Sequence, residues 1–166
     1  MTTPIEQFWQ AYLATLPHDA PAHTATYVAE GFGDNPALAD ELAALVLAGV
    51  KTATCSALWD WQAEGNPIPQ PGAFWIVLDG RGAPLCITET VEVTHSRYDE
   101  VDAAFAYEEG EDDRSLQAWR DAHYRFFSRT LPAIGKEFAT DMPLVCERFR
   151  VVYRGAEIAR GFQNFF

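Results

Sequence analysis

The sequence predicts an α+β domain, and three observations support this. Helical hydrophobic periods lie near both ends of the chain, a hairpin signal lies in its middle, and a strand with period two lies late in the chain. The order helices, strands, helix, strand is typical of an α+β domain. At 166 residues with 48% hydrophobic content, the chain has the size of one domain with a substantial core.

The N-terminal part predicts two helices. Thr3 and Glu6 have the spacing of a capping box, with a proline between them at the first helical position, and apolar residues follow at helical spacing. Residues 18–33 show no period and are expected to be irregular. A second helix begins at Asn35-Pro36 with apolar residues on one face, and Gly49 ends it.

The middle of the chain predicts extended segments. Residues 51–58 are rich in threonine and small side chains and are expected to be extended, and the proline-rich run 66–72 is expected to be a loop. Residues 73–78 and 84–94 flank an Asp79-Gly80 turn, which is a strong hairpin signal. The sheet is expected to begin at this hairpin.

The C-terminal third predicts a short helix, a long helix and a strand. A helical patch at 101–107 leads into the acidic run 108–113. Apolar residues then recur at helical spacing over residues 116–127, which predicts a long amphipathic helix. After a turn at Gly135, residues 143–153 alternate with period two and predict the last strand.

One domain is expected over residues 1–154, with the N-terminal helix packed on it, and residues 155–166 are expected to be an appended tail. The first ten residues lack the features of a signal peptide, and no window approaches a membrane span. We therefore expect a cytoplasmic protein that is not bound to a membrane. The cysteines are far apart and are expected to be free thiols: Cys55, Cys86 and Cys146.

The net charge of −12 disfavours a surface that grips long nucleic acid through its phosphates. The charge is uneven along the chain. Residues 1–113 hold 3 basic against 19 acidic side chains, a net charge of −16, whereas residues 114–166 hold 9 against 5, a net charge of +4. The later segment can therefore supply a local cationic face, although a solvated face is the simpler interpretation.

Four stretches together resemble the ASCH (activating signal cointegrator homology) family, in its bacterial stand-alone members. They comprise the G-x-K-x-x-T run with Gly49, Lys51 and Thr54, then residues 84–90, 109–123 and 142–149, in the order expected of the family. The resemblance spans residues 30–154. It implies a PUA-like, mostly antiparallel β-barrel with flanking α-helices and a cleft suited to RNA or a nucleoside.

The resemblance also implies a function. Members of the family have been assigned RNA binding, ribonuclease activity or amide hydrolysis of N4-acetylcytidine. The small amidohydrolase members look as if they use the Lys and Thr of the motif with a later Glu, which here implies Lys51, Thr54 and Glu111, with Glu109 as the alternative carboxylate. A hydrolase is the first hypothesis, because the acidic chain suits a small, weakly charged substrate. A non-catalytic RNA-binding module in RNA metabolism or translation regulation is the alternative.

Such a site makes chemical and geometric demands. A threonine hydroxyl is a poor nucleophile, and Lys51 can activate Thr54 only if its pKa is depressed. Positions 51 and 54 point to opposite faces of an extended strand, so the site requires a bend after Gly49. Glu111 or Glu109 can act as a general acid, or hold a substrate amine, if its pKa is raised. In the simpler interpretation, Lys51 caps the second helix and Thr54 is an ordinary strand residue.

Further residues are candidates for contact with the substrate or with RNA. The cationic ones are Arg114, Arg120, Arg125 and Arg129. With Ser128 they can line a phosphate-binding edge, beside Trp59 or Tyr98 as stacking platforms. His123 is a secondary candidate, because a core histidine is the simpler interpretation. No metal-ligand spacing is present, so no metal or cofactor is expected, and a divalent cation at the acidic run is conceivable but unsupported. The partner is expected to be RNA or a modified nucleoside, and both monomer and homodimer stay open.

Overall fold

A computed structural model describes residues 1–156 of the chain. Its centre is a five-stranded sheet with the strand order β1-β3-β4-β5-β2. The strands are β1 (Tyr27–Glu30), β2 (Ala53–Ala57), β3 (Phe74–Leu78), β4 (Pro84–Arg97) and β5 (Pro143–Arg154). The pair β1 and β3 is parallel and the other pairs are antiparallel. The α+β class and the mostly antiparallel sheet are thus confirmed.

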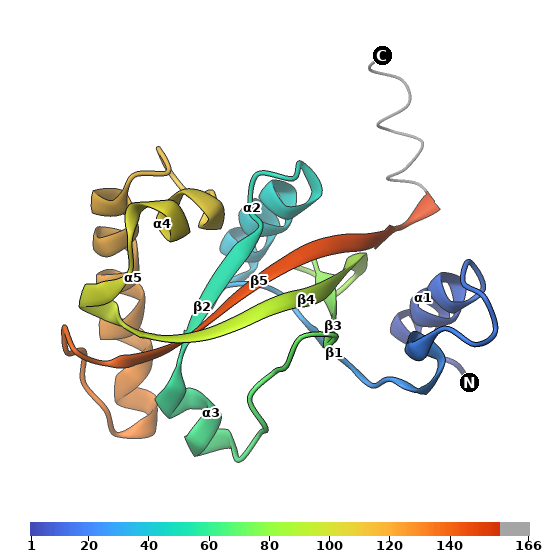
Figure 1. Cartoon of the computed structure of the whole chain (residues 1–166), viewed down its shortest axis with the longest axis horizontal. Helices are drawn as coiled ribbons and strands as arrows, with labels where there is room; N and C mark the ends of the chain where they lie inside the picture. Colours follow the sequence, from blue (N-terminus) through green and yellow to red (C-terminus); the bar gives the residue numbers. More distant parts are fainter. Residues whose placement is uncertain (157–166) are drawn as a thin grey trace.

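The sheet curls into about half of a barrel, with β1 and β2 as its two edges. The long strands β4 and β5 run together through its centre, and helices flank them (Figure 1). The helices are α1 (Pro4–Leu13), α2 (Pro36–Leu47), α3 (Leu58–Glu64), α4 (Ala103–Glu109) and α5 (Leu116–Thr130). None of the helices within residues 1–156 is long and apolar enough to cross a membrane. The predicted tail, 155–166, lies outside the described residues from 157 onward.

Helix α1 begins as its sequence predicts. The Thr3 hydroxyl accepts the backbone N–H of Glu6, and the Glu6 carboxylate accepts the backbone N–H of Thr3. The helix then packs Trp9 and Tyr12 on the sheet, where both rings lie near Phe74. One apolar face thus attaches the helix to β3.

Two elements differ from the prediction. Strand β1 lies within residues 18–33, which were expected to be irregular. It is a short edge strand of Tyr27–Glu30 that, within residues 1–156, pairs only with β3, so tertiary pairing and not a local period defines it. Helix α3 follows β2 directly, has no side-chain cap, and ends at Gly65 in the left-handed region. Its seven residues are too few for a clear helical period.

The bend that the G-x-K-x-x-T run requires is present between α2 and β2. Gly49 has a φ of +73°, and the N–H groups of Val50 and Lys51 both donate to the Leu45 carbonyl. This reversal brings the start of β2 against the end of α4, where the N–H of Thr52 donates to the Glu108 carbonyl over 2.8 Å. Two segments far apart in the sequence therefore meet at Lys51.

Candidate functional site

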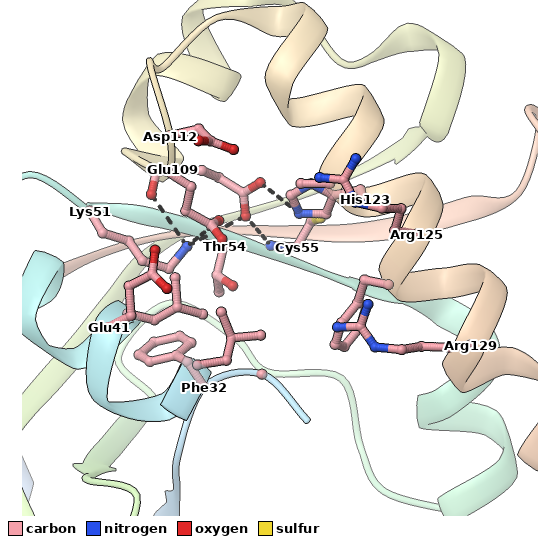
Figure 2. Close-up of a pocket in the computed structure, with 16 residues that line it drawn as sticks. Phe32, Glu41, Lys51, Thr54, Cys55, Glu109, Asp112, His123, Arg125 and Arg129 are labelled. Carbon is pink, nitrogen blue, oxygen red and sulfur yellow. Dashed lines mark hydrogen bonds and ion pairs between the residues drawn. The ribbon is translucent and has the colours of Figure 1, made fainter. Parts of the chain in front are cut away.

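A pocket of about 270 Å³ lies between α2, the start of β2, the α4–α5 loop and α5. Figure 2 shows side chains from all of these segments converging on it. The predicted site residues that line it are Lys51, Thr54, Glu109, Glu111, His123, Arg125 and Arg129. We call it the Lys51 pocket.

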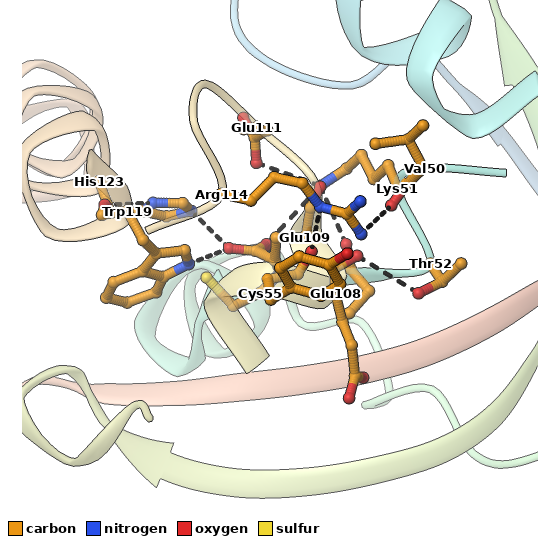
Figure 3. A network of polar contacts seen from close by, with 12 residues as sticks. Val50, Lys51, Thr52, Cys55, Glu108, Glu109, Glu111, Arg114, Trp119 and His123 are labelled. Atoms are coloured by element: carbon orange, nitrogen blue, oxygen red, sulfur yellow. Dashed lines mark hydrogen bonds and ion pairs between the residues drawn. The ribbon is translucent and has the colours of Figure 1, made fainter. Parts of the chain in front are cut away.

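Lys51 lies at the centre of a polar network (Figure 3). Its side chain is 1% exposed, and Nζ donates to the Ala53 carbonyl over 2.9 Å and to Glu111 Oε2 over 3.2 Å. Nζ also lies 3.7 Å from Glu109 Oε1. Burial lowers the pKa of Lys51, but the two carboxylates outweigh it, so the pKa is raised. The sequence-based requirement of a depressed Lys51 pKa is therefore not met in the unliganded site, where Lys51 is an ammonium.

Glu109 is a buried carboxylate with every oxygen engaged. Oε1 accepts the N–H of Cys55 over 3.0 Å, and Oε2 accepts the indole N–H of Trp119. His123 Nε2 lies 3.1 Å from the same Oε2. Burial raises the pKa of Glu109, but His123 and Lys51 lower it more, so the pKa is below its ordinary value. Glu109 is thus an ionised group that organises the site from beneath.

His123 is held by acceptors at both ring nitrogens. Nδ1 lies 2.8 Å from the Trp119 carbonyl, and Nε2 faces Glu109. A carbonyl and a carboxylate both require a donor, so the imidazolium satisfies both contacts and a neutral ring satisfies one. Burial lowers the pKa of His123, but Glu109 outweighs it and the pKa is raised. The ring also stacks on Trp119 at 4.2 Å.

Cys55, Glu109 and His123 each bring one potential metal ligand within 4.8 Å of the others. A metal would need a thiolate and a free imidazole nitrogen. Burial and Glu109 instead raise the pKa of Cys55 well above its ordinary value, and the Glu109 oxygens already accept donors. The three residues therefore fit a hydrogen-bonded network better than a metal centre.

Thr54 lies on β2 at the inner end of the pocket (Figure 2). Within residues 1–156, its hydroxyl makes no hydrogen bond to another protein group. Thr54 is directly opposite Glu147 on β5, so the two side chains share one face of the sheet. Its hydroxyl is thus available to a ligand.

Two predicted stacking platforms are not in the Lys51 pocket. Tyr98 is 7% exposed and belongs to the apolar core beneath α5, where its hydroxyl donates to the Arg120 carbonyl. Trp59 packs against the same core, with Lys136 Nζ 5.4 Å from its ring. Both rings therefore lie in or against the core and not in the Lys51 pocket, because their large apolar area is used for packing.

Within residues 1–156, the residues of the predicted phosphate-binding edge lie in different places, and two of them, Arg125 and Arg129, line the Lys51 pocket. Arg114 donates to the carbonyls of Tyr107 and Val50 and so fastens the α4–α5 loop. Arg129 lines the pocket but is paired with Asp34 through contacts of 2.6 and 2.9 Å. Arg120 and Ser128 are exposed and do not line the Lys51 pocket. Of the helix arginines, Arg125 remains at the rim without an ion pair among residues 1–156.

Sequence analysis missed several residues that line the pocket. Phe32 is 5% exposed, and its ring centroid lies 5.5 Å from Lys51 Nζ. Glu41 and Asp112 add acidic groups to the rim, and Cys55 lies next to Thr54. Phe32 lies in the segment without a period, and the sequence predicts only a free thiol at Cys55, so no local signal marks either residue as part of a site.

Comparisons with known proteins give consistent matches. An ASCH domain model matches residues 28–153. The chain is similar to the crystal structure of an ASCH domain from Lactobacillus crispatus JV V101, with 36% identity and a TM-score of 0.85 over 91% of this chain and 95% of that one. Protein EF3133 from Enterococcus faecalis V583 has 34% identity and a TM-score of 0.82, over 100% and 98% of the two chains. Hypothetical protein PH0355, at 12% identity, shares the fold with a TM-score of 0.52 over 76% of this chain and 100% of that one. No curated protein matches the chain.

Proposed function

The chain belongs to the ASCH domain family, and from this premise we propose that it hydrolyses the amide of an acylated nucleoside of the N4-acetylcytidine type. One observation carries the proposal. The ion pair of Lys51 and Glu111, 3.2 Å long, and the unbonded hydroxyl of Thr54 line the same pocket. A nucleophile, a base and an acid are therefore available on one side of a bound amide.

The ion pair of Lys51 and Glu111 can still supply a base, although the pKa of Lys51 is raised. Lys51 is fully buried, whereas the Glu111 side chain is 25% exposed and lines the pocket, where solvent can reach it. A bound substrate excludes solvent from the pocket, which disfavours two charges relative to a neutral amine and a carboxylic acid. One proton shift from Lys51 to Glu111 then yields a base for Thr54 and an acid for the leaving group.

The resulting reaction balances its protons. Lys51 takes the hydroxyl proton as Thr54 Oγ1 bonds to the acyl carbon, and Glu111 protonates the departing nucleoside amine as the C–N bond breaks. Water then attacks the acyl ester and gives its proton to Glu111. The Thr54–acyl bond breaks, and the Thr54 oxygen recovers its proton from Lys51, which releases the carboxylic acid. Glu109 stays ionised throughout and holds Lys51 and His123 in place.

A small substrate fits the site better than an RNA chain. The pocket volume of about 270 Å³ suits one nucleoside. Its rim carries the acidic groups Glu41 and Asp112, and Arg129 is already neutralised by Asp34. The net charge of −12 also opposes a long polyanion. These observations favour the hydrolase proposal over the RNA-binding module.

The test is turnover of N4-acetylcytidine, measured as cytidine formed by chromatography. Wild type is expected to release cytidine, and Thr54→Val, which keeps the side-chain shape, is expected to lower the rate by about 10²-fold or more. Thr52→Val is the matched control, because Thr52 is exposed and bonds only to the Glu108 carbonyl through its hydroxyl. It is expected to keep full activity.

A parallel incubation with labelled single-stranded RNA separates the alternatives. Cleavage of RNA that depends on Thr54 or Lys51 would point to a ribonuclease. Saturable RNA binding without turnover of either substrate would replace the hydrolase proposal with the RNA-binding module. Equal turnover of N4-acetylcytidine by wild type and a folded Thr54→Val protein would also refute the assigned nucleophile.

A further inference from the structure

A second pocket, of about 210 Å³, lies inside the curl of the sheet. All five strands contribute to its wall, and α3 closes it near the β1 edge. Figure 1 shows α3 at the end of β2, beside the strands that form this curl. The pocket shares Thr54 and Cys55 with the Lys51 pocket, so the two are neighbours along β2. We call it the Glu147 pocket.

Its wall has a one-sided charge. The residues that line it include four carboxylates and no lysine, arginine or histidine. The carboxylates are Glu30, Asp60, Glu64 and Glu147. The remaining wall is largely apolar and includes Trp61 and Trp75. Aromatic faces and carboxylates together attract an organic cation and repel phosphate.

Glu147 is the residue that distinguishes this pocket from an ordinary acidic surface. It is 4% exposed, and Oε1 accepts one hydrogen bond from the Thr90 hydroxyl over 3.3 Å. Within residues 1–156, Oε2 has no donor and Glu147 has no cationic partner. Within residues 1–156, every side-chain oxygen that is fully shut off from solvent has a hydrogen-bond partner. Glu147 Oε2 has none, so it is not shut off from solvent, and it opens into the pocket that Glu147 lines.

Glu147 differs from Glu109 in how its charge is compensated. Both carboxylates are buried, but Lys51 and His123 compensate Glu109 from within the protein. Burial of Glu147 raises its pKa, and burial together with Glu64 raises the pKa of Glu30 and of Asp60. A buried carboxylate that no internal cation compensates is costly to ionise, so it takes up either a proton or a cation from outside the protein.

We propose that the Glu147 pocket binds an organic cation with N–H donors, an amine, amidine or guanidine, whose charged head bonds to Glu147 Oε2 and whose apolar part packs on Trp61 and Trp75. The positive charge of such a ligand complements the carboxylates of the wall, and its apolar part complements the aromatic side chains. The cation lies beside the Thr54 hydroxyl, because Thr54 borders both pockets. The inference does not depend on the proposed hydrolysis, since it rests on a different set of side chains.

The test compares benzamidinium with benzamide, its neutral analogue of the same shape, by calorimetric titration of the whole protein. Benzamidinium is expected to bind, and benzamide is expected to bind about tenfold more weakly or not at all. Tetramethylammonium, which has no N–H donor, is expected to bind more weakly than benzamidinium. Thus the three probes separate charge, hydrogen bonding and simple filling of the cavity.

Variants locate the binding. Glu147→Gln is expected to weaken benzamidinium binding about tenfold or more, and Asp60→Asn on α3 several-fold. Glu100→Gln, whose side chain is 59% exposed on the surface, is the control and is expected to bind as wild type. Circular dichroism checks that each variant is folded, and Asp60→Asn keeps the test decisive if Glu147→Gln does not fold.

Three outcomes overturn the inference: no saturable benzamidinium binding by the folded wild type, equal affinity for benzamide, or unchanged affinity in both pocket variants. Failure of N4-acetylcytidine turnover leaves this result untouched, because the titration measures binding without chemistry. Conversely, loss of benzamidinium binding leaves the assignment of Thr54 and Lys51 standing. The two proposals are therefore separable.

Discussion

Replacing Glu109 with glutamine is a direct test of the charge network beneath the Lys51 pocket. Glutamine keeps the size of the side chain but removes its charge and turns one acceptor into a donor. In the wild type, Oε1 accepts from Cys55 and faces Lys51, and Oε2 accepts from Trp119 and faces His123. Either orientation of the amide therefore places its NH₂ group against two existing donors.

The expected cost follows from burial. Glu109 is 1% exposed, so water cannot replace the lost contacts, and Lys51 and His123 lose their shared counter-ion. Removing one partner of a buried ion pair destabilises a protein by about 3–5 kcal/mol. For a domain of this size, that corresponds to a fall in Tm of about 6–20 °C.

Equilibrium unfolding in urea, followed by tryptophan fluorescence and circular dichroism, measures the effect. Glu108→Gln is the matched control, because the Glu108 side chain is 34% exposed and pairs with Arg148 near the surface. It is expected to cost less than about 1 kcal/mol. A loss in Glu109→Gln no larger than that of Glu108→Gln would refute the reasoning that the buried network holds the site together.

Two further predictions concern pH and the loop after α4. The pKa of His123 is raised above its ordinary value of about 6.5, so its contribution to stability is full below that pH and is lost as the pH rises through the folded pKa. The free energy of unfolding of the wild type, measured in urea, is expected to fall between pH 6.5 and about pH 8.5, where thiols begin to titrate. His123→Gln is expected to reduce this dependence on pH. Equal pH dependence in the two proteins contradicts the assignment. Gly110 has a φ of +75°, and an added Cβ would lie 2.5 Å from the Val50 carbonyl oxygen, so Gly110→Ala is expected to cost about 2–5 kcal/mol in the same assay. Gly135→Ala, at a φ of +72° with no atom within 4 Å, should cost only about 1–2 kcal/mol, and equal losses would exclude the close contact as the cause.

Several features of the fold follow from local sequence. The capping box at Thr3, the Asn35 cap of α2 and the hairpin between β3 and β4 all lie where the sequence predicts them. Each is a contact between residues a few positions apart, so a local pattern contains the information. Strand β1 was not predictable in this way, because its partner, β3, comes more than forty residues later in the chain.

The candidate site also contains residues that a local motif predicts and residues whose place depends on packing. The motif supplied Lys51 and Thr54 and required the bend at Gly49, which the structure contains. The residues expected to stack, Trp59 and Tyr98, pack in the core instead. An aromatic side chain suits a core and a binding platform equally well by composition, and only its neighbours decide between them.

The sequence by itself determined the α+β class, the turn after α2 and the family to which the run of Gly49, Lys51 and Thr54 belongs, but not strand β1 or helix α3. Only the tertiary structure decided which side chains of the site are charged. Lys51 and Glu109 are 58 positions apart, and their protonation states depend on burial and on mutual distances of a few ångströms. The same holds for Glu147. In the sequence it is one more acidic residue in a strand, and in the fold it is a buried carboxylate in a pocket that no lysine, arginine or histidine lines.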